Sequence, residues 1–151
     1  MSIGDLFRRD VVTCTRETPA DEVAALMRSG HVGDLIVVDA DDQGERPVGI
    51  ITDRDLVLEV LAPQVDAQAV TAADIMSWEL VKANVDDGVE EVIAVMCANG
   101  VRRLPIADEK GMLVGIVTVD DLIGWLAVSL KSLSRLTARE YDIERERRKQ
   151  A

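Results

Sequence analysis

Aromatic residues are scarce in this chain of 151 residues, at 3% of the sequence, although hydrophobic residues as a whole make up 48%. Any core must therefore be built from Val, Ile, Leu, Ala and Met, in one domain or in two small units that share a core. Cations are also few, with 17 Lys and Arg against 28 Asp and Glu and a formal net charge of −11. Because binding to a nucleic-acid backbone depends on Lys and Arg, we expect no nucleic-acid partner.

Membrane, metal and catalytic signals are missing too. No apolar run approaches the roughly 18–20 residues of a membrane span, and the N-terminal segment lacks a secretory apolar region, so we expect no membrane partner. Cys14 and Cys97 show no metal-motif spacing, which favours reduced thiols in a cytoplasmic protein. His31 is the single histidine. Without a Ser/His/Asp or Cys/His pairing, we expect no catalytic residues, no metal site and no enzyme activity.

An internal repeat organises the chain. Residues 5–39 align without a gap on residues 74–108, at a constant offset of 69. The polar loop that follows is three residues longer in the first copy, over 40–47, than in the second, over 109–113, and the alignment then resumes at an offset of 66. A length change confined to such a loop is tolerated in a hairpin. The chain therefore contains a duplication.

Each copy has the pattern of a strand, a helix, a hairpin of two strands, and a final helix. Thr18 with Pro19 and Asp87 with Glu90 resemble helix starts, with Thr18 and Asp87 as the capping residues. The hairpin strands are apolar on both faces, so we expect both faces to be covered. The expected elements are 11–14, 20–29, 35–38, 48–51 and 53–61 in the first copy, and 80–83, 88–98, 104–107, 113–117 and 119–130 in the second.

These elements predict a mixed α/β fold of two β-α-β-β-α repeats with a C-terminal helix. The predicted boundaries are repeat 1 over 1–62, a linker over 63–70, repeat 2 over 71–128 and a charged helical tail over 129–151. Copies of about 60 residues are marginal alone, so the two should pack on each other. An apolar helical stripe in the last helix should pack on this module or on a second copy; its residues are Trp125, Leu126, Val128, Leu130, Leu133 and Leu136.

One short motif occurs in both copies, as GIITDRDL over 49–56 and as GIVTVDDL over 115–122. A Thr followed three residues later by an acid forms a capping box, which stabilises a helix by around 1 kcal/mol. The same helix start presents free N–H groups that favour phosphate. Thr52 could donate a hydrogen bond there, and the Asp55 carboxylate could accept from a ribose diol. The chemistry of these residues leaves both interpretations open.

The doubled pattern resembles a tandem pair of CBS domains, over about residues 3–125. The motifs that carry the resemblance are NGVRRLPIAD, VGIVTVDDLI, DLIVVD and VGIITDRDLV. It implies two repeats packed about a pseudo-twofold axis with two clefts between them, in a stand-alone protein that forms a homodimer. The implied ligand is an adenosine compound such as AMP, ADP, ATP, S-adenosylmethionine or NAD, with Mg²⁺ as a possible companion of its phosphates and no required cofactor.

Matching the family motif residue by residue gives one complete site. Gly49, Thr52 and Asp55 carry the motif itself, and the resemblance implies that Thr52 and Asp55 bind the ribose. Phosphate contacts are implied for Arg102 and Arg103, whose fixed donors suit phosphate oxygens.

The other cleft is expected to be weaker. Gly115, Thr118 and Asp121 repeat the motif, but Gly33 and Asp34 stand where the first cleft has its two arginines. Because the Asp34 carboxylate would repel phosphate, we expect this second site to be empty or to take a neutral adenosine group.

The resemblance implies a non-enzymatic regulatory module of the cytoplasm, of the kind that bacteria use as energy or stress sensors. The alternative is a ligand-free dimerising scaffold that binds an unidentified partner protein and uses Thr52 and Thr118 as helix caps alone.

Overall fold

The computed structural model describes residues 2–149 and divides into two compact units, one up to Val117 and one from Thr118 onward. The first copy of the repeat lies within the first unit and contains all five expected elements. Its elements are η1 Ile3–Asp5, β1 Thr13–Cys14, α1 Ala20–Gly30, β2 Asp34–Asp41, β3 Gly44–Thr52, α2 Asp53–Leu56 and the π-helical stretch η2 Val57–Leu61. The strand β1 is shorter than the sequence predicts, and the hairpin strands are longer.

The second copy follows the same order. Its elements are α3 Ala72–Ile75, β4 Ala83–Asn84, α4 Val89–Asn99, β5 Arg103–Ala107, β6 Leu113–Thr118 and α5 Val119–Lys149. The helices η1 and α3 occupy the same place in the repeat, because the offset of 69 carries Ile3 onto Ala72. The final helix α5 is a single helix of 31 residues that includes residues 129–149 of the charged tail. The prediction of a mixed α/β fold with two repeats and a C-terminal helix is confirmed.

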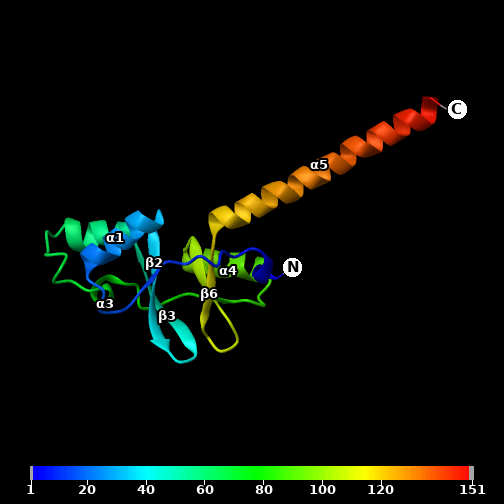
Figure 1. Ribbon diagram of the computed structural model, residues 1–151. Coiled ribbons are helices and arrows are strands. Elements are labelled where there is room, and N and C mark those ends of the chain that lie inside the picture. Colours follow the sequence, from blue (N-terminus) through cyan, green and yellow to red (C-terminus); the bar gives the residue numbers. More distant parts are fainter. Residues whose placement is uncertain (1, 150–151) are drawn as a thin grey trace. The chain divides into compact units, whose positions relative to one another are not determined.

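Each copy forms its own three-stranded sheet, in the orders β1-β2-β3 and β4-β5-β6. The short strand is parallel to its neighbour in both sheets, with Thr13 opposite Ile36 in one and Ala83 opposite Ile106 in the other. These two pairings are related by the offset of 69. The strands β2 and β3 form an antiparallel hairpin, drawn in cyan in Figure 1, with an irregularity in register after Val37.

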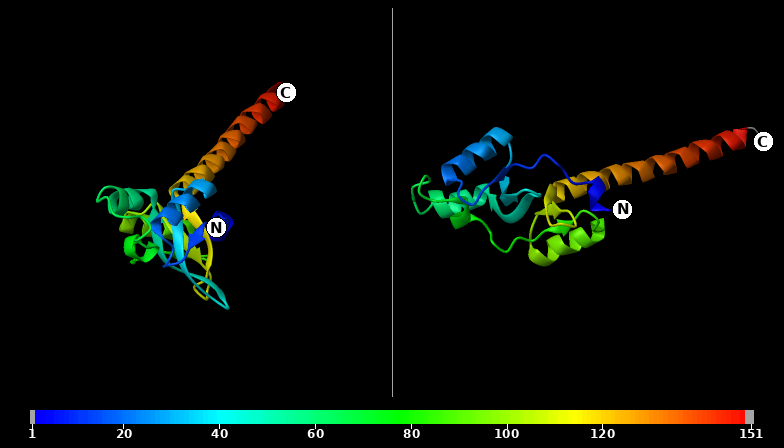
Figure 2. Two further views of the ribbon diagram at one scale, coloured as in Figure 1. Left: turned by 60° about the vertical axis from the view of Figure 1, so that its left-hand side comes forward. Right: turned by 60° about the horizontal axis from the view of Figure 1, so that its bottom comes forward.

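The first residues of each copy are hydrogen-bonded to the other copy. The N–H of Ile3 donates to the Asp87 carbonyl at 2.8 Å, and the N–H of Ala72 donates to the Thr18 carbonyl at 2.8 Å. The repeat relates these two bonds to each other, since Ile3 corresponds to Ala72 and Thr18 to Asp87. The dark blue N-terminal segment accordingly lies beside helix α4 in Figure 1 and in the right-hand view of Figure 2. Each copy thus holds the start of the other, as expected for a pseudo-twofold arrangement.

A second exchanged contact joins the segment after each first turn to a hairpin strand of the other copy. Arg8 and Ile116 exchange two backbone hydrogen bonds, each 2.9 Å long, and the N–H of Ser77 donates to the Ile50 carbonyl at 3.0 Å. Ser77 corresponds to Arg8, and Ile50 to Ile116. Because these bonds join the two copies, they fix the position of one copy relative to the other.

The core contains the apolar residues that the pattern assigned to it. Leu35, Ile36 and Val37 of β2 are fully buried, as are the corresponding residues of β5, which confirms that both faces of these strands are covered. Met27 and Met96 are also buried, on the inner faces of α1 and α4. Burial of this aliphatic material on both faces is the main favourable contribution to folding.

The helix starts differ from the prediction by one residue. Pro19, not Thr18, is the N-cap of α1, and the Thr18 hydroxyl accepts a hydrogen bond from the N–H of Thr15. Gly88, not Asp87, precedes α4, and its N–H donates to the Glu91 carboxylate at 2.9 Å. Both predicted caps were wrong because Thr18 and the Asp87 carboxylate close the preceding turns instead.

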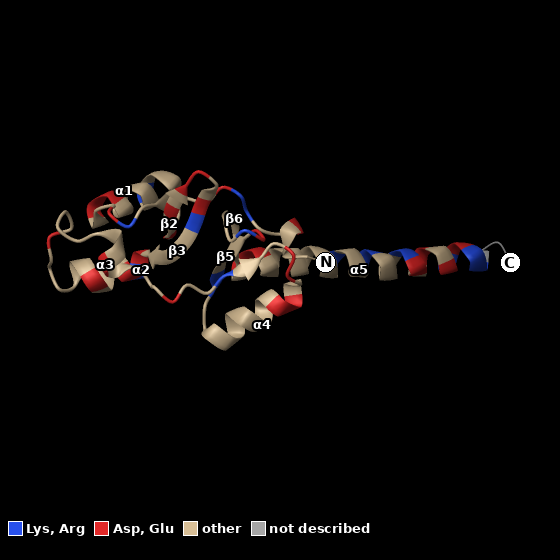
Figure 3. Ribbon diagram, turned by 90° about the horizontal axis from the view of Figure 1, so that it is seen from below, with Lys and Arg blue, Asp and Glu red and all other residues tan. Residues whose placement is uncertain are grey.

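The helix α5 carries its apolar stripe on an exposed surface. The exposed fractions of Leu130, Leu133 and Leu136 are 58%, 62% and 66%. Beyond residue 139 the helix bears charged side chains of both signs, seen as alternating blue and red turns in Figure 3. Over residues 2–149, no helix combines the length and the apolar run that crossing a membrane requires.

Candidate functional site

Residues of both copies line one pocket of the first unit, which has a volume of about 560 Å³. Thr52 and Asp55 reach it from the start of α2, and Arg102 and Arg103 from the start of β5. These four residues were expected from the sequence to share a cleft, and the pocket brings them together. Residues 77, 79–81, 99–101 and 105 of the second copy complete its wall.

The side chains of Thr52 and Asp55 close the first turn of α2. The N–H and the hydroxyl of Thr52 donate to Oδ2 of Asp55, at 2.7 and 2.8 Å, and the N–H of Asp55 donates to the Thr52 hydroxyl at 3.3 Å. This is a complete capping box. All the bonds to the carboxylate fall on one oxygen, so the cap itself leaves Oδ1 of Asp55 available for another partner.

Arg103 makes an ion pair between Nη1 and Oδ1 of Asp34. The two residues occupy equivalent positions of the two copies, since they are 69 residues apart. Their side chains are 31% and 16% exposed, so water screens the pair less than it would a pair at the surface. Asp34, predicted for the second cleft, therefore contacts the cation predicted for the first. The sequence pattern did not reveal this contact because each residue was assigned to its own cleft.

The pocket is also lined by three charged residues that were not among the predicted site residues. Asp53 and Arg54 lie inside the repeated motif, and Glu79 lies in the segment before β4. With Asp55, Arg102 and Arg103, the wall carries three acidic and three basic side chains. The position of Asp53 and Arg54 beside Asp55 could have indicated them, but nothing in the pattern points to Glu79.

Gly49, predicted as a site residue, does not line this pocket. A Cβ atom at Gly49 would lie 2.4 Å from Sδ of Met76, in the second copy. The residue is therefore a glycine because the strand β3 passes close to a side chain of the other copy. In the second copy, a Cβ atom at Gly115 would lie 2.1 Å from the Phe7 ring and 2.5 Å from the Arg8 carbonyl oxygen. Packing between the copies explains both glycines without a ligand.

Thr118 and Asp121 form the same capping box at the start of α5. The N–H and hydroxyl of Thr118 donate to Oδ2 of Asp121 at 2.9 and 2.6 Å, and the N–H of Asp121 donates back to the hydroxyl at 3.2 Å. The geometry matches that of Thr52 and Asp55 closely. The local structure of the motif is thus identical in the two copies, whichever of them binds a ligand.

A third box of this kind went unrecognised in the sequence. Thr71 precedes α3, and both its N–H and its hydroxyl donate to Oδ2 of Asp74 at 2.8 Å. These bonds from Thr71 hold the pKa of the Asp74 carboxyl below its usual range. Asp74 is not among the residues that line the pocket. A Thr-x-x-Asp sequence therefore indicates a helix start, and a binding role needs the pocket around it.

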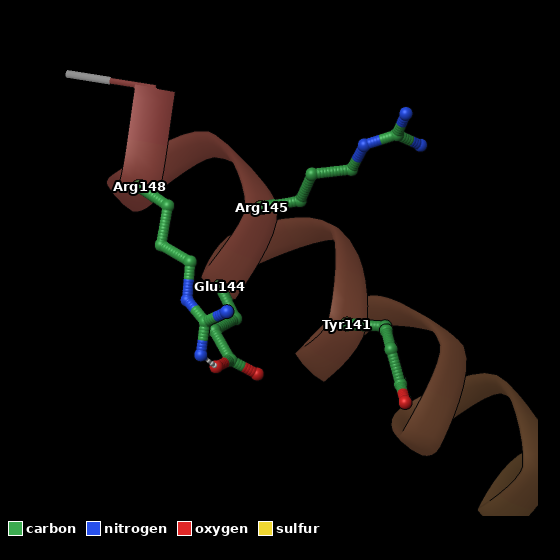
Figure 4. A pocket seen from close by; sticks show the side chains of 4 residues that line it. All are labelled: Tyr141, Glu144, Arg145 and Arg148. Atoms are coloured by element: carbon green, nitrogen blue, oxygen red, sulfur yellow. Dashed lines mark hydrogen bonds and ion pairs between the residues drawn. The ribbon is translucent and has the colours of Figure 1, made fainter.

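Another hollow of the described surface lies outside the repeated motifs. It runs along the last turns of α5 and is lined by Tyr141, Glu144, Arg145 and Arg148. Figure 4 shows that all four side chains come from this one helix, with Arg148 paired to Glu144. Within residues 2–149, no cluster of His, Cys, Asp and Glu has the arrangement of a metal site.

Comparison with known proteins identifies relatives of both copies. The family model described as CBS domain matches residues 3–62 and 72–128. An uncharacterized protein of Methanopyrus kandleri is 40% identical over 123 residues, which are 82% of this chain and 61% of the relative, so the chain spans less than two thirds of that protein. YlbB of Bacillus subtilis, also uncharacterized, is 40% identical over 121 residues, covering 80% of this chain and 78% of YlbB.

A solved structure of the cytosolic domain of the Mg²⁺ channel MgtE in complex with ATP is similar as well. It is 30% identical and has a TM-score of 0.69, and the match covers 82% of this chain and 48% of that one.

Proposed function

The chain belongs to the CBS-domain family, and from this premise we propose that it is a non-enzymatic regulatory module that binds an adenosine-containing ligand. The proposed site is the pocket with Thr52, Asp55, Arg102 and Arg103 in its wall. The MgtE domain, a relative of known structure, holds ATP, which supports an adenosine-containing compound as the class of ligand. In this proposal repeat 1 (1–62) and repeat 2 (71–128) act as one unit across the linker, with residues 129–151 as a separate helical tail.

The observation that carries the proposal is the combination of groups in this one pocket. Ile50, Leu80 and Val81 line it together with Asp55, so an apolar wall suited to a purine lies near a carboxylate suited to a ribose diol. The cap uses Oδ2 of Asp55. Oδ1 can accept from a ribose hydroxyl while the helix start remains intact. The helix cap and the ligand site are then compatible functions of one side chain.

The second site remains a weaker proposal. Thr118 and Asp121 would provide its ribose contacts, with Gly115 and Asp34 as its other motif positions. Asp34 forms an ion pair with Arg103, and its carboxylate cannot donate a hydrogen bond to a phosphate. This site would therefore take at most a neutral adenosine group.

The proposal is tested by thermal unfolding of the full chain with AMP, ADP, ATP, S-adenosylmethionine and NAD, each with and without Mg²⁺. A ligand at about a hundred times its Kd adds roughly 2.7 kcal/mol, or on the order of 5–10 °C for a chain of this size. We expect Asp55→Asn to abolish the shift and the matched variant Asp121→Asn to keep it. If no ligand shifts the transition, the motif is a helix cap alone and the alternative applies, a scaffold for a partner protein.

We also propose that the chain is a homodimer in which two copies of α5 pair through their apolar stripes. Isolated helices gain little stability in water from propensity alone and depend on packing of an apolar face. Leu126 and Leu133 lie seven residues apart on the stripe, and the same spacing continues to Glu140 and Arg147. In a parallel pair of helices, Glu140 would face Glu140 of the second chain, and Arg147 would face Arg147. An antiparallel pair separates the like charges, so we propose the antiparallel arrangement.

The dimer is tested by light scattering after size exclusion. Leu133→Glu should give a monomer, because it places a charge in the proposed seam. Val128→Glu is a matched control, since Val128 is 66% exposed against 62% for Leu133 but lies at the edge of the stripe, about 140° around the helix from Leu133. A monomeric wild-type chain, or equal effects of the two variants, would contradict a seam centred on Leu126 and Leu133.

We propose a cytoplasmic location and a role in energy or stress sensing. Cys14 and Cys97 are both free thiols, which supports a reducing compartment.

A further inference from the structure

We infer that Asp34 sets the charge of the ligand by neutralising Arg103, so that the pocket selects an adenosine compound with a neutral or cationic 5′ group over a polyphosphate. This inference rests on the proposed function of the pocket. It differs from what the motif alone suggests, because two neighbouring arginines at 102 and 103 favour phosphate as long as both are available to the ligand.

The ion pair removes one of these arginines from that role. Arg103 contributes to the pocket wall, and its guanidinium is bonded to Asp34 from the other copy. The Asp34 side chain is 16% exposed, so its charge acts through a poorly hydrated region where screening is weak. A phosphate approaching Arg103 must therefore share that cation with a carboxylate already in contact with it.

The remaining charges do not compensate for this loss. The wall has three cations, Arg54, Arg102 and Arg103, and three acids, Asp53, Asp55 and Glu79. Counting Asp34, which contacts the wall through Arg103, the formal charge around the pocket is −1. The chain as a whole carries −11. A ligand with several negative charges meets an unfavourable local and overall potential, whereas a neutral or cationic adenosine compound does not.

The opposite charges of Asp34 and Arg103 follow from the way in which the duplication brings these two positions together. Residues 34 and 103 are equivalent in the repeat, so the pseudo-twofold axis brings them together. If both positions carried Arg, the two cations would repel each other. A carboxylate at one position stabilises the arginine at the other. The carboxylate of Asp34 therefore stabilises the contact between the copies and also lowers the positive charge available to a ligand.

The test is isothermal titration of the full chain, without divalent cations, with adenosine, 5′-methylthioadenosine, S-adenosylmethionine, AMP and ATP. In the wild-type chain we expect the three compounds without phosphate to bind more tightly than ATP. Asp34→Asn should tighten ATP by at least about tenfold, AMP by less, and leave adenosine unchanged, because one unit charge is removed near the phosphates.

Asp39→Asn is the matched control. Asp39 is also paired with an arginine, Arg16, at 2.7 Å, and it does not line the pocket, so this variant changes the net charge equally and should leave all affinities as they are. If Asp34→Asn fails to fold, the double variant Asp34→Arg with Arg103→Asp preserves an opposite-charge pair. This double variant should weaken ATP further while adenosine binding persists.

Two results would overturn the inference while the proposed function stands. One is that ATP binds the wild-type chain at least as tightly as adenosine does. The other is that ATP affinity does not respond to Asp34→Asn or, if that variant is unfolded, to the double variant. A different result, in which no adenosine compound binds the wild-type chain or any folded variant, would overturn the proposed function and the inference together.

Discussion

The equivalent positions 34 and 103 hold opposite charges, whereas the neighbouring motifs at 52–55 and 118–121 have the same hydrogen bonds in both copies. The motif bonds are local, so each copy makes them alone. The contact between 34 and 103 crosses from one copy to the other, and two identical charges there would repel. The comparison indicates that the duplication preserved the local structure of the motif, whereas the contact between positions 34 and 103 depends on a difference between the copies.

The largest expected effect concerns two glycines at equivalent positions. We expect Gly115→Ala to destabilise the chain by about 3 kcal/mol and Gly49→Ala by about 1 kcal/mol, within the range for overpacking. The added Cβ at Gly115 meets the Arg8 backbone oxygen and the Phe7 ring, whereas at Gly49 its three nearest atoms belong to the flexible Met76 side chain. Urea unfolding of both variants measures the difference. Equal losses would show that the backbone at Arg8 yields as easily as Met76 does.

A smaller effect distinguishes the first strands of the two copies. Burial, followed by the charge of Glu22, raises the pKa of the Cys14 thiol from 9.0 to about 11, whereas the equivalent residue in the second copy is Ala83. Between pH 9 and 11 the unfolded chain loses this proton and the folded chain keeps it, so stability falls as pH rises. The loss is up to about 1.4 kcal/mol at pH 10.

Cys14→Ala should remove this part of the alkaline loss and make the two copies alike at this position. Denaturant unfolding at pH 8 and pH 10 checks it. An unchanged difference between the two pH values in the variant would show that other groups cause the alkaline loss.

The smallest expected effect sharpens the comparison of the two motifs. Thr52→Ala and Thr118→Ala should each cost about 1 kcal/mol, because each removes the hydroxyl from a capping box of similar geometry. Only Thr52→Ala should also reduce the thermal shift produced by a bound adenosine compound. Unfolding with and without ligand separates the two roles. A reduced shift in Thr118→Ala as well would place ligand at the second site.

Much of the fold could be predicted from the sequence because its signals are local or repeated. The 69-residue offset predicted equivalent strands, and Thr13 opposite Ile36 and Ala83 opposite Ile106 confirm it. The helix starts at Thr18 and Asp87 were predicted wrongly, since several residues near a helix start can cap it and the competing turns decide which one does.

The candidate site was predictable to a lesser degree. Thr52, Asp55, Arg102 and Arg103 were predicted to share a cleft, and all four line one pocket, but their role in binding stays a prediction. Glu79 could not be foreseen as part of this wall, because it lies outside any motif. Gly49 was assigned to the ligand, and the structure explains it by the Met76 side chain of the other copy.

The sequence by itself determined the duplication, the order of the elements, the aliphatic core and the capping boxes, since each depends on residues close together in the chain or on a periodic pattern. Only the tertiary structure decided which residues of the two copies meet. It paired Arg103 with Asp34 and packed the Phe7 ring so close to Gly115 that a Cβ atom there would clash with it. Such contacts join residues far apart in sequence, so their energies depend on how one copy packs against the other.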